Sequence, residues 1–335
     1  SRLVRVTLTL SDGSTAVGEC VPVQYVTGET RESAIEALRI AAPALIGIPV
    51  ERPAEAMVRV DRALTDRLGV RDPSVEMPSA RAAIEMALYD ALCSASGLMA
   101  WPLFGGAVPA VETDVTLALT SDTAQRAAEM ASRGFRRFKV KLGRADPDDD
   151  VRALRDVMGA VPDAVFRLDA NQAFTADEAL TVIGRAVDAG ARIECLEQPV
   201  AKEDLQALDA VARRSPVPVF ADEAVRTPAQ ALRVVSDTQV QGINVKLMKS
   251  GIGGARDVAA IARAAGRRLM IGCMLETRRG IGWALALSAG SGAFELFDLD
   301  SHMLLDPSRA DVPDPDPEAS SVRFSQSGPI LSIAA

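Results

Sequence analysis

The stretch RFKVKL at residues 137–142, followed by Gly143, organises the rest of the chain. Its two lysines, Lys139 and Lys141, lie two residues apart in a β-like run and therefore point to the same face of a strand. Further short apolar runs later in the chain each end in a charged side chain. Those side chains are Asp169, Glu197, Asp222, Lys246, and the pair Asp298 and Asp300.

These charges recur at a nearly constant spacing. The steps from Lys141 to Lys246 are 28, 28, 25 and 24 residues, and Asp298 follows after 52 residues, or two steps of 26. A strand, a helix and two short loops occupy about that length, so the spacing predicts repeated β-loop-α units with a charge at the C-terminal end of each strand. Closed parallel barrels keep their chemistry at that end.

Composition limits the class of protein. The 335 residues exceed one ordinary domain, and a hydrophobic content of 48% supports a large core. No apolar run approaches the roughly 20 residues of a membrane span, which predicts no membrane partner. The formal charge of −8 argues against nucleic acid as a partner, because phosphate binding requires a basic face. A small-molecule substrate is expected, and a homo-oligomer is left open.

The cysteines and the N-terminus indicate a cytoplasmic location. No C-x-x-C pair occurs, so the cysteines are expected to be reduced core thiols rather than disulfides or zinc ligands. No signal peptide is recognisable at the N-terminus, and because the sequence begins with Ser1 instead of methionine, a segment is expected ahead of it. The four cysteines are Cys20, Cys93, Cys195 and Cys273.

The N-terminal region, residues 1–108, is predicted to be an α+β domain. Residues 3–10 and 15–23 alternate around an Asp12-Gly13 turn, which indicates a β-hairpin. The polar residues 24–30 are expected to form a loop. The pattern over 31–98 is helical with prolines, including Pro43, as punctuation, and residues 79–96 form an Ala-rich helix expected to be buried.

The second region, residues 109–305, is predicted to be a modified TIM barrel of the form (β/α)7β, with eight strands and seven helices. Helix starts are indicated by a capping box at Thr175 and Glu178 and by Thr227 followed by a proline. The strands are expected at about 111–119, 137–142, 164–169, 193–197, 217–222, 242–247, 268–273 and 294–299.

The C-terminal segment, residues 306–335, is expected to return to the N-terminal region. The acidic, proline-rich residues 311–317 (DVPDPDP) are interpreted as a solvated linker, with an interaction motif as the alternative. Residues 321–333 alternate again and predict a small hairpin that rejoins the N-terminal region.

The carboxylates of Asp169, Glu197 and Asp222 should converge at the mouth of the barrel. Three carboxylates brought together repel one another and must be neutralised by protonation or by a cation. An all-oxygen ligand set with open positions suits Mg²⁺. The alternative is that each carboxylate pairs with a neighbouring arginine or lysine.

Lys141 and Lys246 flank these carboxylates in strand order. A neighbouring cation, such as Lys139, and a bound metal disfavour the charged form of a lysine, so the pKa should fall. Two lysines on opposite sides of one bound carbon could remove a proton from one face and return it to the other, which gives racemisation or epimerisation. A divalent cation would stabilise the resulting enediolate. The alternative makes Lys139 and Lys141 counter-ions of the carboxylates.

Five motifs in this order carry a family resemblance: KVKLG (139–143), LDAN (168–171), LEQP (196–199), ADE (221–223) and the glycine-rich 244–254 that begins NVKLMKSG. Together they resemble the muconate-lactonising subgroup of the enolase superfamily, whose sites use Lys or His bases with Mg²⁺. The resemblance implies a capping domain over a modified barrel, Lys141 and Lys246 as the acid/base pair, and Asp169, Glu197 and Asp222 as ligands of one Mg²⁺. It also implies that the 24–30 loop closes over the site.

Asp298 and Asp300 share one strand face and could bind a cation. The pair resembles the D-x-D signature of dipeptide epimerases, in which two aspartates hold the α-ammonium group of the substrate. Anionic substrates would be repelled by two uncompensated aspartates. The competing explanation is internal pairing with Arg278 or Arg279. By the same resemblance, substrate contacts are expected from Thr116, Lys139, Cys273 and Met274.

Four other residues are not expected to take part in the chemistry. His302, the only histidine, is expected outside the reaction, and Glu223 alternates away from Asp222. Cys195 and Cys273 are interpreted as small core residues because no histidine is available to activate them.

The sequence therefore predicts a Mg²⁺-dependent dipeptide epimerase that inverts the α-carbon of the C-terminal residue through Lys141 and Lys246. A muconate cycloisomerase, an N-acylamino acid racemase or an o-succinylbenzoate synthase could use the same site. A non-catalytic barrel that binds metal or ligand is a remote alternative. The sequence does not specify the second side chain of the dipeptide. Ala-Glu is one option, with Arg278 or Arg279 as the cation for its distal carboxylate, and hydrophobic and mixed dipeptides are the others.

Overall fold

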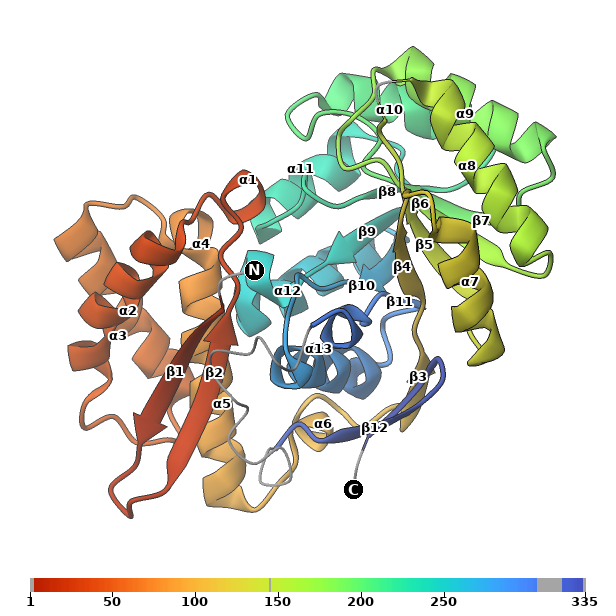
Figure 1. Ribbon diagram of the computed structural model, residues 1–335. Helices are drawn as coiled ribbons and strands as arrows, with labels where there is room; N and C mark the ends of the chain where they lie inside the picture. The colour runs from red at the N-terminus through yellow and green to blue at the C-terminus, as the bar shows by residue number, and fades with distance from the viewer. Residues whose placement is uncertain (1–2, 145, 306–320, 334–335) are drawn as a thin grey trace.

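The computed structural model describes residues 3–144, 146–305 and 321–333 (Figure 1). Its centre is one sheet of eight parallel strands, arranged in the order β11-β10-β9-β8-β7-β6-β5-β4. The strands are β4 (Val115–Ala118), β5 (Arg137–Lys141), β6 (Val165–Asp169), β7 (Ile193–Glu197), β8 (Val219–Ala221), β9 (Gly242–Val245), β10 (Arg268–Ile271) and β11 (Leu296–Phe297).

The sheet curls until its first and last strands meet. Asp114 N, just before β4, donates to Phe297 O of β11 at 3.2 Å, and Leu299 N donates to Thr113 Oγ1 at 2.8 Å. These bonds join the two edges, and a closed sheet leaves no strand edge exposed. The predicted modified barrel is confirmed.

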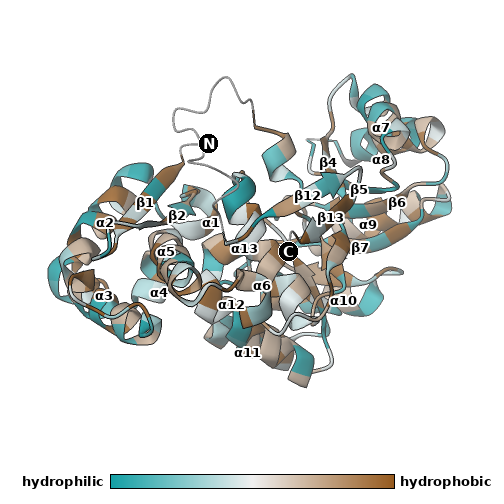
Figure 2. Cartoon of the chain, turned by 90° about the horizontal axis from the view of Figure 1, so that it is seen from below, coloured by the Kyte–Doolittle hydropathy of each residue, from teal (hydrophilic) through white to brown (hydrophobic). Residues whose placement is uncertain are grey.

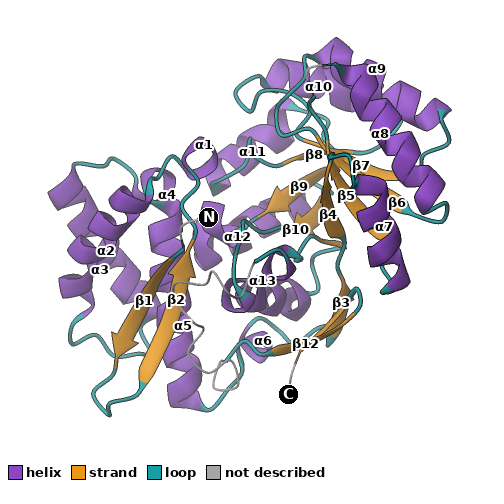
Figure 3. Ribbon diagram, in the orientation of Figure 1, coloured by secondary structure: helices purple, strands orange, loops and turns teal. Residues whose placement is uncertain are grey.

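Seven helices follow the first seven barrel strands and lie outside them (Figure 3). Two helix starts agree with their predicted signals: Thr175 accepts from Glu178 N in a capping box, and Thr227 accepts from Gln230 N with Pro228 next in the chain. The helices are α7 (Thr123–Ser132), α8 (Pro147–Ala160), α9 (Ala176–Asp188), α10 (Leu205–Arg214), α11 (Pro228–Asp237), α12 (Leu247–Ala264) and α13 (Arg278–Ser291).

The N-terminal region packs a hairpin against a buried helix. Strands β1 (Val4–Thr9) and β2 (Thr15–Cys20) pair antiparallel, as predicted, and helix α5 (Pro78–Ser96) lies between β2 and α12. Gly18 permits this close approach, because a Cβ there would overlap the carbonyl oxygen of Ala83. The remaining helices of this region are α1 (Gln24–Thr27), α2 (Arg31–Leu45), α3 (Pro53–Leu68), α4 (Pro73–Glu76) and α6 (Ala100–Leu103).

Three features differ from the sequence-based expectations. Residues 24–30 contain a short helix, α1 (Gln24–Thr27), instead of a loop throughout, and Pro43 lies inside α2 rather than at its end. The strand expected at 111–119 is divided into β3 (Ala110–Glu112) and β4.

The C-terminal hairpin is present as β12 (Phe324–Ser327) and β13 (Ile330–Ile333). Its strand β13 pairs with β3 instead of with a strand of the N-terminal region, which gives a three-stranded sheet. A link to the N-terminal region is made by Ser321, whose carbonyl accepts from Ala100 N at 2.9 Å. The predicted acidic linker at 311–317 lies outside the described residues.

Hydropathy follows the layers of the fold. The outer helices α2 and α3 carry both hydrophilic and hydrophobic segments, as expected for helices with one buried face (Figure 2). Within the described part of the chain, no helix combines the length and the apolar character needed to cross a membrane.

Candidate active site

The charged residues that end the barrel strands gather at one end of the barrel. Register explains part of this arrangement, because Lys141 of β5 is paired with Asp169 of β6, and Asp169 is paired with Glu197 of β7. Since neighbouring residues of parallel strands point to the same side, these three side chains share one surface. The structure brings Asp222 and Lys246 to the same surface.

The carboxylates of Asp169, Glu197 and Asp222 form a buried cluster. One oxygen from each lies within 4.8 Å of the others, and each residue is at most 1% exposed. Glu197 Oε2 accepts no hydrogen bond, although the ammonium nitrogen of Lys139 is 2.9 Å away. Three buried carboxylates with a spare oxygen form an all-oxygen donor set, which fits a hard divalent ion such as Mg²⁺.

Lys139 is a counter-ion of this cluster, as the alternative interpretation expected. Its ammonium nitrogen lies 2.8 Å from Asp298 Oδ2, 2.9 Å from Glu197 Oε2 and 3.1 Å from Asp169 Oδ2. The side chain is almost completely buried, so these contacts offset the cost of its desolvation.

Lys141 and Lys246 each contact a single carboxylate oxygen. Lys141 Nζ is 2.6 Å from Asp169 Oδ2, and Lys246 Nζ is 2.6 Å from Asp222 Oδ2. Lys246 is buried, whereas the side chain of Lys141 is 35% exposed. Both lysines line a cavity above the carboxylates.

The charges of the cluster shift its pKa values in opposite directions. Burial raises the pKa of Glu197 to about 8, and Asp169 adds to the increase. Burial also raises the pKa of Asp222, but Lys246 and Lys249 hold it well below its ordinary value. Burial, the largest single effect, lowers the pKa of Lys246, but Asp222, Glu197 and Glu223 together raise it by more, so the pKa is raised overall. The protein's own groups therefore do not produce the lowered pKa that the sequence predicts for this lysine.

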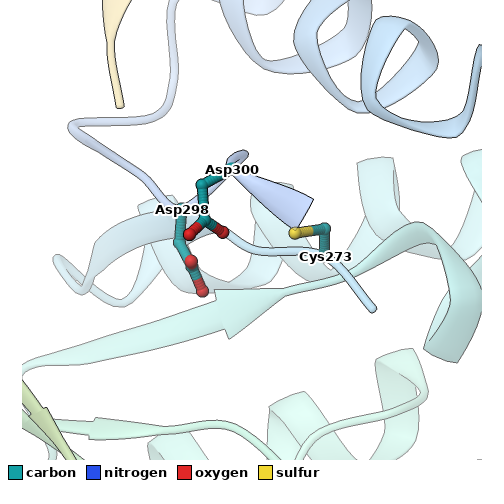
Figure 4. Close-up of side chains that lie close together, drawn as sticks. All are labelled: Cys273, Asp298 and Asp300. Atoms are coloured by element: carbon teal, nitrogen blue, oxygen red, sulfur yellow. The ribbon is translucent and has the colours of Figure 1, made fainter. Parts of the chain in front are cut away.

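Asp298 and Asp300 lie beside Cys273 at the β10–β11 side of the site (Figure 4). Asp298 pairs with Lys139, while Thr116 N donates to Asp300 Oδ2 at 2.6 Å. Burial and the charge of Asp298 raise the pKa of Asp300 to about 6. Asp298 and Asp300 therefore line the cavity, and each already has a hydrogen-bonding partner within the protein.

The two arginines proposed as partners of these aspartates make other contacts. Arg278 donates to Phe324 O at 2.6 Å and stacks on the Phe324 ring, 4.2 Å from its centroid. Arg279 lies 3.5 Å from Asp90 of α5. Neither guanidinium lines the cavity, so the cationic partner of Asp298 is Lys139.

The cavity has a volume of about 630 Å³ and lies between the barrel and residues 21–26 of the N-terminal region. Arg226 Nη1 donates to Val26 O at 3.3 Å, and Lys202 Nζ donates to Tyr25 O at 3.5 Å, which ties this segment to the barrel. The predicted substrate contacts Thr116, Lys139, Cys273 and Met274 all line it.

Sequence reasoning missed several residues of the site. Asn244 Nδ2 donates to Glu197 Oε1 at 2.8 Å, and strand alternation could have found it, since Asn244 lies two residues before Lys246. Lys249, from the first turn of α12, donates to Asp222 O at 2.6 Å and carried no such signal. Glu223 lines the cavity, contrary to expectation, because β8 ends at Ala221 and alternation no longer applies.

Of the residues given less weight by the sequence, His302 and Cys195 do not line the cavity. His302 contacts Gln326 Oε1 at 2.7 Å and stacks edge-on against Phe324. Cys195 is buried, and all four cysteines are free. Cys273 lines the cavity, where burial, Asp298 and Asp300 raise the pKa of its thiol well above the ordinary value.

Gly272 leaves space for the side chain of Lys246, which follows β9. A Cβ at this position would lie 2.6 Å from Asn244 Oδ1 and 2.9 Å from Lys246 Cε. Because these atoms end flexible side chains, we expect Gly272→Ala to fold but to displace Lys246, lowering kcat about 10-fold or more. The matched Gly184→Ala, in a helix with no atom near the added Cβ, should stabilise the protein by about 0.5–1 kcal/mol and leave kcat unchanged. Steady-state kinetics and thermal unfolding of both variants measure the difference.

Comparisons with known proteins agree with this architecture. Residues 122–326 match the family model "Enolase C-terminal domain-like", and residues 1–105 match "Mandelate racemase / muconate lactonizing enzyme, N-terminal domain". The L-Ala-D/L-Glu epimerase of Bacillus subtilis is 36% identical over 307 residues, which cover 90% of this chain and 81% of the relative. The hydrophobic dipeptide epimerase of Enterococcus faecalis is 34% identical, covering 87% and 80%.

Solved structures give the same result. A substrate-liganded complex of the Bacillus subtilis L-Ala-D/L-Glu epimerase superposes with a TM-score of 0.88 at 33% identity, covering 99% of this chain and 88% of that one. The Enterococcus faecalis dipeptide epimerase complexed with Mg and L-Leu-L-Tyr gives 0.87 at 31% identity, covering 99% and 89%. The chain therefore belongs to the mandelate racemase/muconate lactonizing enzyme family of the enolase superfamily.

Proposed function

We propose that this protein is a Mg²⁺-dependent dipeptide epimerase that inverts the α-carbon of the C-terminal residue. The observation that carries the proposal is the position of Asp298 and Asp300, which line the same cavity as Lys141 and Lys246. Two aspartates can hold the α-ammonium group of a dipeptide, while the lysines act on the neighbouring residue. The family relationship supports the proposal, since relatives 31–36% identical to the chain include several named dipeptide epimerases.

Asp169, Glu197 and Asp222 would hold the metal ion. When bound, Mg²⁺ supplies positive charge beside the substrate carboxylate, where negative charge develops as the α-proton leaves. Lys139 contacts both Glu197, of the carboxylate cluster, and Asp298, of the aspartate pair. Its positive charge therefore orients both carboxylates and offsets part of their negative charge. In the proposed complex, the metal cluster would bind the carboxylate of the substrate, and Asp298 and Asp300 would bind its ammonium group.

Lys141 and Lys246 would exchange the α-proton. Lys141 is the last residue of β5 and Lys246 follows β9. These two strands lie four places apart in a ring of eight, the largest separation that such a ring allows. A carbon bound between them would present opposite faces to the two ammonium groups. One lysine removes the proton in its neutral form, and the other returns a proton to the opposite face, so the configuration is inverted.

Thr116, Cys273 and Met274 would position the dipeptide backbone at the other end. Thr116 N donates to Asp300, which fixes the orientation of that carboxylate. Cys273 and Met274 follow β10 and border the cavity next to the aspartates. Cys273 Sγ lies within 4.8 Å of a carboxylate oxygen of each aspartate, so this segment would contact the N-terminal residue of a bound dipeptide.

Other reactions of the same site fit the acidic pair less well. Muconate, N-acylamino acids and the precursor of o-succinylbenzoate carry no ammonium group, so Asp298 and Asp300 would repel or fail to pair with them. A barrel that only bound metal would have no use for two lysines on opposite sides of the cluster. The test is incubation of dipeptides with the protein and Mg²⁺ in D₂O. Deuterium at the α-position of the C-terminal residue supports epimerisation, and its absence from a broad dipeptide set would refute it.

The pKa of Asp300 predicts the acid limb of the activity profile. This carboxyl titrates near pH 6 because burial and Asp298 raise its pKa. Its ionised form, present above that pH, is the one that attracts an ammonium group, so kcat/KM for a dipeptide should fall as the pH drops below about 6. Asp300→Asn should lower kcat/KM at neutral pH and remove this limb. A profile measured between pH 5 and 8 that keeps the limb in Asp300→Asn would contradict the assignment.

A further inference from the structure

We infer that the residue inverted by this enzyme carries an uncharged, apolar side chain, so the preferred substrates are hydrophobic dipeptides; this rests on the proposed function. The inference follows from how polar and apolar groups divide around the cavity. Charged side chains form its floor, at the ends of the barrel strands, whereas apolar side chains form its roof and part of its rim.

The charges on the floor all have partners or roles there. Lys139 contacts Asp298 and Glu197, Lys141 contacts Asp169, and Lys246 contacts Asp222. Among the cavity-lining residues that the structure describes, these lysines are the cations, and no arginine is among them. A carboxylate on the substrate side chain would therefore have to compete for a lysine that the reaction itself needs.

The roof is formed by residues 21–26 of the N-terminal region, and it is mainly apolar. Val21 and, within helix α1, Val26 are buried, and Pro22 and Val23, which lie between Val21 and the start of α1, are half-buried. Gln24 contributes an uncharged amide, and the ring of Tyr25 is 73% exposed. A side chain projecting from the α-carbon away from the charged floor would meet this apolar surface, which favours burial of hydrocarbon.

The rim on the ammonium side is also apolar. Met274 and Leu275 follow β10, and Leu304 follows the aspartate pair, and all three line the cavity. This rim surrounds the place where the N-terminal residue would lie. The cavity thus offers hydrocarbon contacts to both side chains of a dipeptide.

Two cations near the roof, Arg226 and Lys202, are not among the residues that line the main cavity. Arg226 donates to the carbonyl oxygens of Val26 and Thr27, and Lys202 donates to that of Tyr25. Both residues line a second cavity of about 180 Å³, which shares Glu223 with the main cavity. Their hydrogen bonds tie residues 25–27 to the barrel.

The acidic residues of the main cavity lie away from residues 21–26, where the side chain of the inverted residue would lie. Asp298 and Asp300 lie at the ammonium end, and Glu223 is next to Asp222 on the floor, where Asn171 Nδ2 donates to it at 3.1 Å. A lysine or arginine side chain under the roof would find no carboxylate among the described residues 21–26. A charge of either sign held beneath residues 21–26 would thus be desolvated without a partner from that segment, and the free carboxylate oxygen of the cavity, Glu223 Oε2, lies on the floor beside Asp222.

The test compares kcat/KM for α-deuteration in D₂O with Mg²⁺ across L-Ala-L-Leu, L-Ala-L-Phe, L-Ala-L-Glu and L-Ala-L-Lys. We expect the leucine and phenylalanine dipeptides to exceed the other two by about 30-fold or more. An equal or higher value for the glutamate or lysine dipeptide would overturn the inference while leaving the proposed function intact. If none of the four dipeptides and no member of a wider dipeptide set exchanged its α-proton, the proposed function itself would be refuted.

A cation added to the roof should change this selectivity. Gln24 is exposed, so Gln24→Lys should fold normally and place an ammonium group above the cavity. We expect the ratio of kcat/KM for L-Ala-L-Glu to that for L-Ala-L-Leu to rise about 10-fold. The matched variant Gln239→Lys adds the same charge at an exposed position away from the cavity and should leave the ratio unchanged. A ratio unaltered by Gln24→Lys would show that the side chain does not lie beneath residues 21–26.

Discussion

Replacing Lys246 with alanine should reduce α-proton exchange of one of the two dipeptide diastereomers on the order of 1,000-fold while the protein stays folded. Lys246 lies at the end of β9 with its ammonium nitrogen 2.6 Å from Asp222, inside the cavity. Lys249 cannot replace it, because Lys249 is fully buried and its nitrogen is held by Asp222 O at 2.6 Å and Asn244 O at 2.9 Å. The loss should therefore appear in kcat for exchange, measured by NMR in D₂O with Mg²⁺.

The two-base arrangement makes a sharper prediction when Lys141→Ala is measured beside Lys246→Ala. Each lysine faces one side of the bound carbon, so each variant should fail to deprotonate one of the two diastereomers, and neither should epimerise at a normal rate. Arg256→Ala, which removes an exposed charge from the helix that follows Lys246, is the control for charge loss and should exchange normally. Normal epimerisation by either lysine variant would eliminate the two-base mechanism.

Local patterns in the sequence were sufficient for the barrel. Most barrel strands are short apolar runs followed by a charge, because the strands are buried along their length and the polar groups of the site gather at their C-terminal ends. The constant spacing then reflects one helix and two loops for each strand. The predicted strand at 193–197 coincides with β7, and the helix predicted at 79–96 differs from α5 by one residue.

Features that depend on distant pairing were not predictable in this way. The division of the strand at 111–119 follows from the pairing of β3 with β13, which lies more than 200 residues later in the chain. Local alternation in either segment specifies a strand but not its partner. The short helix α1 likewise lies where residues 24–27 meet the barrel, and polar composition alone indicated only a loop.

The site shows the same division between local and long-range information. Strand alternation placed Lys139 and Lys141 on one face, and both line the cavity. The contact between Lys139 and Asp298 joins residues 159 positions apart, so the sequence offered Arg278 and Arg279 as partners instead. The pKa of Lys246 also could not be predicted from local sequence, because it depends on the sum of nearby charges. At this lysine the effect of Asp222 outweighs that of the neighbouring cation.

Replacing Glu197 with glutamine should remove both metal binding and activity. Glu197 is fully buried, and its Oε1 accepts from Asn244 at 2.8 Å while Oε2 lies 2.9 Å from the ammonium nitrogen of Lys139. Glutamine keeps the shape of the side chain but has one negative charge fewer, and its amide group would turn a donor towards either Asn244 or Lys139. We expect Mg²⁺ affinity to fall about 100-fold or more, since changes to groups that only support metal ligands already cost 10–100-fold.

Calorimetric titration with Mg²⁺ tests this expectation without depending on turnover. The matched control is Glu194→Gln on the same strand, where the carboxylate pairs with Arg167 at 2.7 Å and lies outside the cluster. This control should bind Mg²⁺ like the unmodified protein. If Glu197→Gln also bound Mg²⁺ normally, the ion would have to lie elsewhere, and the lysines would then face no carbon acidified by a neighbouring metal. Weak binding together with lost exchange in Glu197→Gln alone would connect the buried carboxylates to the chemistry, because the two variants differ only in which carboxylate of one strand loses its charge.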